Sequence, residues 1–466
     1  MKKNRDISLY IIIFLDILLF LSMLVLCGLY LNLRINGNSS SLPEIPESDK
    51  WVLSGTGYDV QSGAKSILET TFIGFKTSDG KMTAASYTSS ARTPLLTYLN
   101  DTLSLLMSEN VEIMSFPNNT QKEEFVSSLT ESPKFFYAAY YSEVPSAVFL
   151  PATKNNFSSV APEVNFYLKY IFILPDDQNN VYAVCLSDDL DVAILRSTEN
   201  IEYTVDELSA YNGVRGFADF SFMENSIRPV AYFTESFDVD SVVIAESENF
   251  YSFNLQDVKT LQLLRVLDFN INMVRMFSSG DGNASSFVDS GMELYISNDK
   301  YSIEYSAYDS GIHMSAFLGY YPESRKNYSL TDAVYCVRLL LNSFDQILVG
   351  GNAFPSIVGV YQNDTGSIIF EFKYLYNGVL LNDNDYDILI EIKDNYIINI
   401  KMDPIFCDSG RLFKPVVPQK LAIELLNAGE TNGAENSDTE YYAMFESDPL
   451  SNQIQLIWTA KKRIGD

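Results

Sequence analysis

The sequence predicts an α+β fold: an N-terminal transmembrane helix followed by antiparallel sheets, each covered by helices. Three observations predict it. Residues 8–33 form a long apolar run that contains a single carboxylate, Asp16. Many later segments alternate apolar and polar side chains, as strands do when one face of their sheet is covered. Three amphipathic helical segments each precede a group of such strands, which indicates repeated helix-then-strands units.

The apolar run at residues 8–33 is long enough to cross a bilayer, because about 20 residues suffice for a transmembrane helix. Three basic residues precede the run, and only Arg34 follows it closely. This bias places residues 1–7 in the cytoplasm and everything after the span outside. The run is too long for a cleaved signal peptide and lacks a small-residue cleavage site. We therefore expect an uncleaved single-pass anchor in the cell membrane, with an extracellular C-terminal region.

A carboxylate inside the span costs about 2.5–3.5 kcal/mol on insertion scales, so such a residue usually faces a partner. Asp16 shares one side of the predicted helix with four other residues, because they follow at intervals of three or four positions. We call this side the membrane stripe; it consists of Asp16, Phe20, Met23, Cys27 and Tyr30. The stripe predicts an interface with a partner helix. The alternative is that Asp16 reaches the cytoplasmic headgroups, about 12 Å away along the helix. The sequence leaves both interpretations open.

The chain is strongly acidic, with a formal net charge of −28 over 466 residues. Beyond residue 34 there are 28 basic and 58 acidic residues, a net charge of −30. Such a surface repels nucleic acid, so we expect no nucleic-acid partner. Tyr and Phe number 30 each, which favours strands over helices.

The chain beyond the anchor divides into a polar stalk at residues 34–50 and three expected α+β domains. These are an N-terminal domain at 51–205, a central domain at 206–325 and a C-terminal domain at 326–466. In the first, apolar spacing predicts helices near residues 94–109 and 122–129. Strand-like runs follow in the same domain at residues 134–141, 165–174 and 181–186.

The three later helices are predicted near residues 255–267, 331–344 and 418–428. Ser329 and Asp332 resemble a capping box at the start of the second helix. Alternation at residues 367–376 puts Glu371 and Lys373 on the open face of a sheet. Two-residue hairpin turns are predicted at Asn377-Gly378 and at Asp394-Asn395, and further strands at residues 388–392, 398–402 and 454–460.

Catalytic signatures are absent from the sequence. His313 is the one histidine, so a histidine-based triad or a multi-histidine metal site is hard to build. Asp383, Asp385 and Asp387 resemble the start of a calcium loop, but Ile388 stands where that loop needs glycine, which favours an acidic turn. We expect no catalytic, cofactor-binding or metal-binding residues. A hydrolase that uses two carboxylates stays open, since 60 acidic residues always offer some pair.

Four cysteines are present, and the predicted span contains Cys27. The other three cannot all pair, and a core of this size needs no disulfide. We expect Cys185, Cys336 and Cys407 to be buried thiols, and a Cys336–Cys407 bridge stays open.

Several segments resemble the YycH family. The run FVDSGMELYISNDKYSIEYSAYDSGIHM, residues 287–314, is similar to a family motif of two strands in which the second carries a Glu-Tyr pair, here Glu304-Tyr305. The helix at 331–344 and the run GSIIFEFKYLYNGVLL, residues 366–381, resemble the next part of the family's pattern, including a Tyr-x-x-Asn-Gly-like turn. The likeness is clearest over residues 255–466. Asp16 and Cys27 depart from the family's pattern.

The resemblance implies a regulatory role and no enzymatic activity. Members of the family sit on the outer face of the membrane in Gram-positive bacteria. They associate with a YycI-like membrane protein and with a sensor histidine kinase that governs cell-wall metabolism. The resemblance does not fix the direction of regulation. Two other classes stay open: an extracytoplasmic binding module for a wall fragment or small ligand, and the carboxylate-dependent hydrolase.

Overall fold

The structure is a computed structural model, and all the residues that it describes lie in one compact unit, residues 51–466. It describes residues 65–107, 110–153, 165–197, 201–211, 215–223, 226–244, 253–280, 282–297, 302–308, 311–319, 328–348, 353–382, 384–405, 407–413, 417–429, 439–447 and 454–462. The predicted anchor, stalk and membrane stripe lie outside these ranges. Within them, no helix combines the length and the apolar character needed to cross a membrane.

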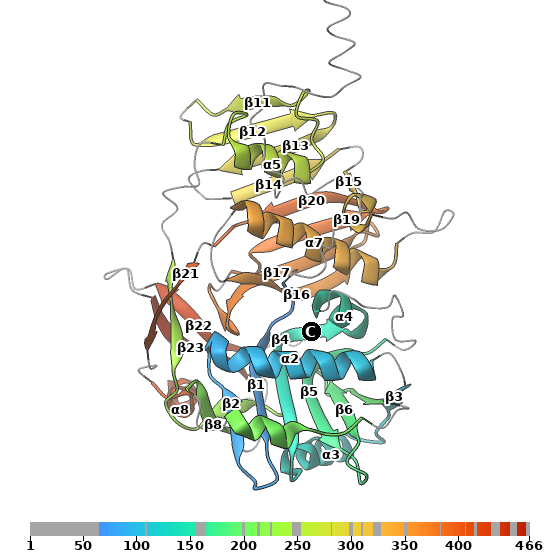
Figure 1. The fold of residues 1–466 in the computed structure, drawn as a ribbon, viewed down its shortest axis with the longest axis vertical. Coiled ribbons are helices and arrows are strands. Elements are labelled where there is room, and N and C mark those ends of the chain that lie inside the picture. Colours follow the sequence, from blue (N-terminus) through green and yellow to red (C-terminus); the bar gives the residue numbers. More distant parts are fainter. Residues whose placement is uncertain are drawn as a thin grey trace, which may run out of the picture. The chain divides into compact units, whose positions relative to one another are not determined.

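Two large, mostly antiparallel sheets and several helices confirm the α+β class (Figure 1). The first sheet has nine strands in the order β3-β7-β6-β5-β4-β1-β2-β8-β9. Its strands are β1 Thr70–Lys76, β2 Met82–Ala85, β3 Asn110–Met114, β4 Phe135–Pro145, β5 Tyr167–Pro175, β6 Val181–Leu186, β7 Val192–Arg196, β8 Phe217–Phe222 and β9 Ala231–Phe233. The same part of the chain contains α2 Ser89–Leu106, α3 Asn119–Glu131, α4 Ser146–Thr153 and a 3₁₀ helix, η3 Val205–Tyr211.

The second sheet has twelve strands, and one of its pairings, β18 with β22, is parallel. Its strands are β11 Arg275–Ser278, β12 Ala284–Asp289, β13 Met292–Ser297, β14 Ser302–Ala307, β15 Ile312–His313, β16 Phe354–Gln362, β17 Ile368–Tyr376, β18 Val379–Leu380, β19 Ile388–Lys393, β20 Tyr396–Met402, β22 Thr439–Ser447 and β23 Ile454–Lys462. Its helices are α5 Val258–Val266, α6 Ser315–Leu318, α7 Leu330–Leu348 and α8 Gln419–Gly429. A separate two-stranded sheet pairs β10 Val239–Ile244 with β21 Cys407–Phe413.

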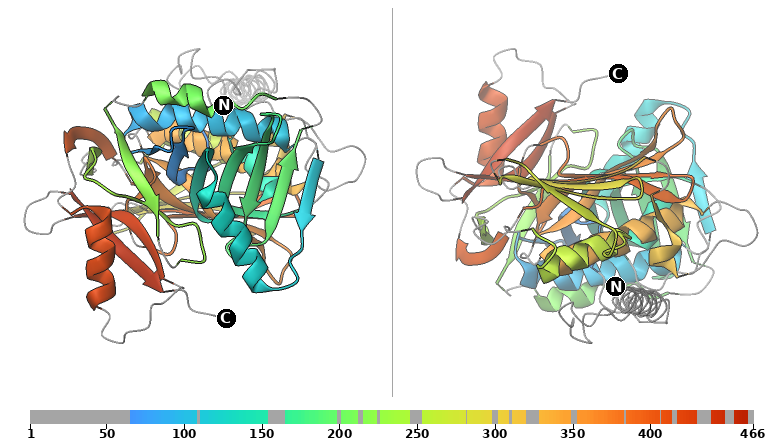
Figure 2. Two further views of the ribbon diagram at one scale, coloured as in Figure 1. Left: turned by 90° about the horizontal axis from the view of Figure 1, so that it is seen from below. Right: turned by 90° about the horizontal axis from the view of Figure 1, so that it is seen from above.

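The predicted order of one helix followed by strands is present three times in the second sheet. Helix α5 precedes β11–β14, α7 precedes β16–β20, and α8 precedes β22–β23. These strands join into one sheet, because β14 pairs with β20 and β18 pairs with β22. Helices α5 and α7 contact each other and lie on the same face of this sheet (Figure 2). The domain boundaries at residues 205 and 325 stay predictions.

The sequence predicted one helix cap and two turns correctly. Ser329 Oγ accepts from the Asp332 N–H at 3.1 Å and Asp332 Oδ2 accepts from the Ser329 N–H at 2.9 Å, which is the predicted capping box. Asn377 and Gly378 have φ of 51° and 84°, and Asp394 and Asn395 have φ of 49° and 73°. Both pairs are therefore two-residue hairpin turns of the expected kind.

Two predictions need correction. Helix α2 begins at Ser89 and not near Pro94, and Asp240 Oδ2 accepts from the Ser89 N–H at 3.0 Å. A distant carboxylate thus supports the first turn, and no local pattern reveals it. The second concerns Lys373, which is 3% exposed and not on an open face. Its ammonium lies 5.2 Å from the centroid of the Tyr141 ring, because β4 packs against β16 at this end of the sheet.

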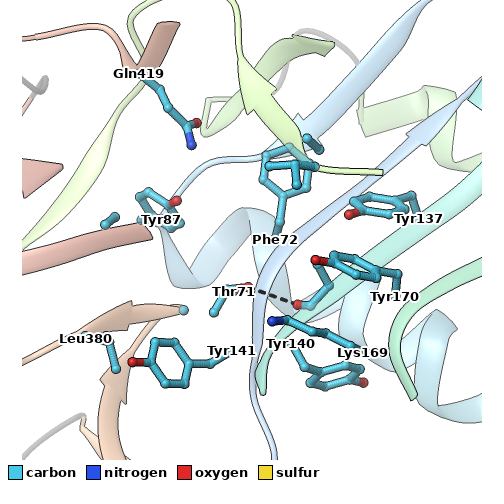
Figure 3. A pocket seen from close by; sticks show the side chains of 15 residues that line it. Thr71, Phe72, Tyr87, Tyr137, Tyr140, Tyr141, Lys169, Tyr170, Leu380 and Gln419 are labelled. Atoms are coloured by element: carbon cyan, nitrogen blue, oxygen red, sulfur yellow. Dashed lines mark hydrogen bonds between the residues drawn. The ribbon is translucent and has the colours of Figure 1, made fainter. Parts of the chain in front are cut away.

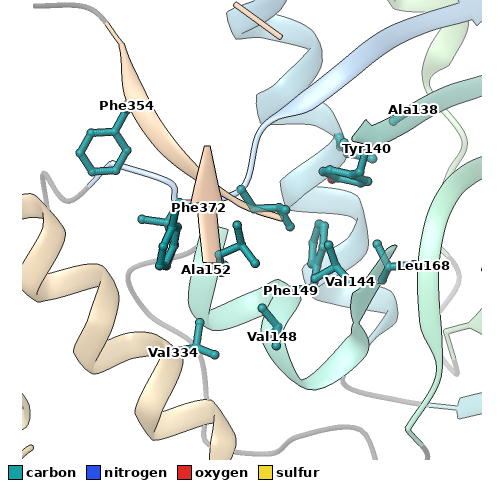
Figure 4. Packing of buried hydrophobic residues seen from close by; sticks show 14 of the residues in the cluster. Ala138, Tyr140, Val144, Val148, Phe149, Ala152, Leu168, Val334, Phe354 and Phe372 are labelled. Atoms are coloured by element: carbon teal, nitrogen blue, oxygen red, sulfur yellow. The ribbon is translucent and has the colours of Figure 1, made fainter. Parts of the chain in front are cut away.

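Helix α4 joins the two large sheets. Figure 4 shows its side chains Val148, Phe149 and Ala152 between strands of the first sheet and Val334 of α7. Nearby, the buried Arg338 of α7 donates from Nε to the Lys65 carbonyl at 2.8 Å and from Nη1 to the Pro151 carbonyl at 3.3 Å. Burial lowers the pKa of Arg338 to about 10, so its guanidinium stays charged at neutral pH.

Candidate functional site

A cavity of about 80 Å³ lies where the first sheet meets elements from the C-terminal part of the chain (Figure 3). A single water needs roughly 10–15 Å³ of such space, so the cavity can hold a small organic group. It is lined by Thr71, Phe72, Tyr87, Tyr137, Ala139, Tyr140, Tyr141, Lys169, Tyr170, Val230, Ala231, Gly378, Leu380, Gln419 and Ala443.

The cavity forms where the ladder of the first sheet is irregular. The register of β1 on β4 shifts between Thr70 and Phe72, and that of β4 on β5 shifts between Ala139 and Val144. The lining residues Thr71, Tyr140 and Tyr141 lie at these two register shifts. Such irregularities bend a strand and change the direction of its side chains, which opens space beside a sheet. The Thr71 hydroxyl donates to the Ala139 carbonyl at 3.2 Å, so it replaces part of the lost ladder.

Six of the fifteen lining residues are aromatic, and all of the fifteen except Lys169 are uncharged. Phe72 packs against Tyr137 with ring centroids 6.0 Å apart, and the Tyr137 hydroxyl donates to the Pro229 carbonyl at 2.5 Å. Burial raises the pKa of the Tyr87, Tyr137 and Tyr140 hydroxyls above the ordinary tyrosine value, so they remain protonated. The wall therefore offers ring faces and neutral hydroxyls.

Among the described residues that line the cavity, Lys169 is the one with a charge, and none is a carboxylate. Lys169 is 4% exposed, and its ammonium forms a salt bridge with Asp188 Oδ1 at 3.3 Å. The same oxygen lies 3.7 Å from Arg228 Nε, so two cations share one carboxylate. Glu143 is a second carboxylate nearby; it is exposed and accepts from the Asp188 N–H at 3.2 Å.

Gln419 supplies a polar group from α8. It is 5% exposed, and its Oε1 accepts from the Phe233 N–H at 2.9 Å. Its amide NH₂ makes no hydrogen bond to any described residue. Gln419 lines the cavity, so this NH₂ group is available to a bound molecule or water.

The turn Asn377-Gly378 closes the cavity from the second sheet. Asn377 Nδ2 donates to Asp240 Oδ2 at 3.1 Å, and Asn377 Oδ1 accepts from the Ser89 hydroxyl at 2.9 Å. A Cβ at Gly378 would lie 2.6 Å from the Thr70 carbonyl oxygen and 2.8 Å from Arg92 Nη2. Only glycine therefore fits here without displacement of its neighbours.

The residues that the sequence singled out do not build this cavity. The membrane stripe, Asp16 to Tyr30, lies outside the described residues, and so does Asp383. His313 is on β15, where its ring lies 4.9 Å from the Tyr396 ring and its Nδ1 lies 2.7 Å from Ser315 Oγ. Asp387 is 2% exposed and accepts from the Tyr374 N–H at 2.7 Å, which explains it as a structural residue of the acidic turn.

Cys185 and Cys336 are buried free thiols, so the Cys336–Cys407 bridge is not formed. Burial raises the pKa of both thiols, which makes them unreactive. The expected burial of Cys407 stays a prediction, because its side chain lies outside the described part of the chain.

In the part of the chain that the structure describes, no three His, Cys, Asp or Glu side chains gather as a metal ion requires. The cavity itself was missed at the sequence level. Lys169 was the available signal, since it interrupts an apolar strand.

Comparison of the sequence with models of protein families and with curated protein sequences finds no match. The structure, in contrast, is similar to the crystal structure of YycH from Bacillus subtilis. The TM-score is 0.53 at 10% sequence identity, and the match covers 86% of this chain and 95% of that chain. The resemblance to the YycH family is therefore confirmed at the level of the fold.

Proposed function

We propose that this chain is a membrane-anchored extracytoplasmic regulator that binds and modulates a sensor histidine kinase controlling cell-wall metabolism, together with a YycI-like membrane protein. The fold shared with YycH over 86% of the chain carries the proposal. It implies no catalytic activity of its own. A protein of this kind acts by binding, and it can bias two states of a kinase only through contacts that differ between those states.

The segments behind the family resemblance occupy well-defined places in the second sheet. The run at residues 287–314 spans β12 to β15. Tyr305 of β14 is fully buried, with its ring centroid 6.2 Å from that of Phe269, and its neighbour Glu304 is exposed. The run at 366–381 forms β17, the Asn377-Gly378 turn and β18. These segments are thus parts of the framework, and they support the likeness of fold that the proposal uses.

The proposed arrangement puts the anchor at residues 8–33 beside the helices of the kinase, with residues 35–466 outside the cytoplasm. Protease added to intact cells stripped of their wall tests this topology, because it should degrade the part of the chain after the anchor. Full protection of that part would refute the orientation.

The partner is tested by affinity capture of the full chain from its own membrane. We expect a sensor histidine kinase and a YycI-like protein among the captured proteins. Capture that repeatedly recovers neither would overturn the proposal. Detergent alone can separate helices, so the cells are cross-linked before lysis.

The membrane stripe is tested in the same assay. Asp16→Leu should lower recovery of the kinase in part, since hydrogen bonds between membrane helices average about 0.6 kcal/mol. Cys27→Leu should do the same by crowding. Ile17→Ala and Leu18→Ala, off the stripe, are matched controls at equal membrane levels. If Asp16→Leu recovers the kinase as well as the native chain does, association comes from the part outside the membrane.

The two alternative classes make different predictions. A binding module for a wall fragment or small ligand would need no kinase partner, and capture would recover none. A carboxylate-dependent hydrolase needs two close carboxylates in a cleft. The described residues that line the cavity include none, so the cavity offers no support for that class.

A further inference from the structure

We propose that the tyrosine-lined cavity beside β1, β4 and β5 is a binding site for a small organic carboxylate with an aromatic or apolar body. This inference is independent of the kinase partner. It depends on the composition of the cavity wall, on one buried cation and on one buried amide whose NH₂ has no hydrogen-bond partner among the described residues.

The sign of the ligand's charge follows from the wall. Tyrosine faces can also bind cations, as in aromatic cages for quaternary ammonium groups. Such a cation would meet the Lys169 ammonium and no carboxylate among the described lining residues. An anion would instead be attracted, because the Lys169 ammonium faces the cavity. The carboxylate that pairs with this ammonium, Asp188, is not among the lining residues. The local charge therefore favours a carboxylate group over an ammonium group.

The aromatic rings that line the cavity indicate that the rest of the ligand is aromatic or apolar. Phe72, Tyr137 and Tyr170 present apolar surface, and offset or edge-on packing of aromatic rings is worth more than burial of area alone. A purely polar anion such as phosphate would leave these faces without contact. The cavity of about 80 Å³ is several times the roughly 10–15 Å³ that one water needs, which suits a ligand no larger than about one ring.

The position of Gln419 indicates that the ligand has a second polar group, at the end opposite its carboxylate. Figure 3 shows Gln419 and Lys169 on opposite sides of the cavity, with aromatic side chains between them. The Gln419 carbonyl is already used by the Phe233 N–H, so its NH₂ is the group that can meet a ligand. A hydrogen-bond acceptor on the ligand, opposite the carboxylate, would satisfy it.

The test uses 4-hydroxybenzoate and benzoate as probes, each compared with its neutral amide. The full chain is held in lipid nanodiscs, with empty nanodiscs as blank, and binding is followed by ligand-observed NMR and by tyrosine fluorescence. We expect both carboxylates to bind and both amides to bind about tenfold or more weakly, since a charged hydrogen bond is lost. No binding of either carboxylate, or equal binding of the amides, would overturn the proposal.

Three variants locate the site. Lys169→Met should lower the affinity for 4-hydroxybenzoate by about tenfold or more. Gln419→Glu keeps an acceptor for the Phe233 N–H but points a carboxylate oxygen at the ligand, so it should also weaken binding. Lys122→Met, which removes an exposed salt bridge to Asp191 at 3.0 Å, is the matched control and should bind as the native chain does.

Gln419→Glu keeps the test decisive if Lys169→Met does not fold, because it leaves the Lys169–Asp188 pair intact. Unchanged binding in Gln419→Glu would exclude this cavity as the site. Failure of the probes would leave the kinase proposal untouched, and failure of the kinase capture would leave this inference untouched.

Discussion

The two large sheets differ in how their faces are covered. In the first sheet, β5 is buried from Leu168 to Leu174 without interruption, so both of its faces are covered. In the second sheet, β14 alternates between the fully buried Tyr305 and the exposed Glu304, so one face stays open in the part of the sheet around β11 to β14. Tyr295 of β13 and Phe277 of β11 lie on that open face, 37% and 56% exposed.

This difference determines the cost of a polar residue in each sheet. On the open face, Glu304 of β14 stands opposite Lys401 of β20, and such exposed pairs contribute about 0–1 kcal/mol. In the first sheet, Lys169 is buried among rings and requires the Asp188 carboxylate. A buried polar side chain in the first sheet carries a larger desolvation cost than an exposed one in the second. Such a residue is therefore a stronger indication of a functional site.

The largest expected effect contrasts one ring from each sheet. Phe172→Ala removes a fully buried ring whose centroid lies 5.0 Å from that of Tyr137 and 5.6 Å from that of Phe135. We expect a loss of about 3–5 kcal/mol in the free energy of unfolding, from lost burial and the cavity left behind. Denaturant unfolding of the full chain, read by tryptophan and tyrosine fluorescence, measures it.

Tyr295→Ala is the matched control, because it truncates a ring on the open face. It should cost about 1 kcal/mol or less. Equal losses in the two variants would contradict the difference in coverage between the sheets. The slope of the transition must stay constant for the comparison to hold.

A second contrast uses two glycines at opposite ends of β17. Gly366 and Gly378 both have positive φ, 81° and 84°, so alanine costs roughly 1–2 kcal/mol at either site. A Cβ at Gly366 meets only Gln362 Nε2 at 3.8 Å, whereas a Cβ at Gly378 collides with the Thr70 backbone. Gly378→Ala should therefore lose about 1–3 kcal/mol more than Gly366→Ala.

The thermal midpoints of these two variants, measured side by side, check this. Gly378 also lines the cavity, so Gly378→Ala should lower 4-hydroxybenzoate binding while Gly366→Ala should not. Indistinguishable midpoints would mean that the Asn377-Gly378 turn does not pack closely against Thr70 of the first sheet, as it does in the structure.

The sequence predicted the second sheet better than the first, for a physical reason. Alternation in β19 and β20 and the turn residues Asp394-Asn395 report local geometry, and these elements lie where they were expected. In the first sheet, continuous apolar runs such as β5 gave the strand but not the elements that cover it. The burial of Lys373 and the start of α2 depend on contacts with distant residues, which periodicity cannot reveal.

The cavity was beyond the sequence for the same reason. Its lining combines residues from β1, β4, β5, the Asn377-Gly378 turn and α8, which are separated by up to several hundred positions. The register shifts that create its space leave no signature in the pattern of apolar residues. Lys169, which interrupts the apolar run of β5, is the one signal in the sequence that could have indicated this place, and no prediction from the sequence used it.

The smallest expected effect concerns the single histidine, at the border of the second sheet. Burial lowers the pKa of His313 below its ordinary value of 6.5. The Ser315 N–H lies 3.2 Å from Nδ1 and donates to it, so protonation of Nδ1 would remove an acceptor. Because the folded pKa is the lower one, the contribution of His313 to stability is present above pH 6.5 and is lost as the pH falls through the folded pKa.

Two measurements check this. With histidine selectively labelled, the chain gives one imidazole signal, and its titration midpoint should lie below 6.5. The stability of the native chain relative to His313→Asn should decrease between pH 6.5 and that midpoint, since the variant keeps an acceptor for the Ser315 N–H but does not titrate. A midpoint at or above 6.5 would show that the ring is solvated and that β15 is less closely packed against Tyr396 than the 4.9 Å ring separation indicates.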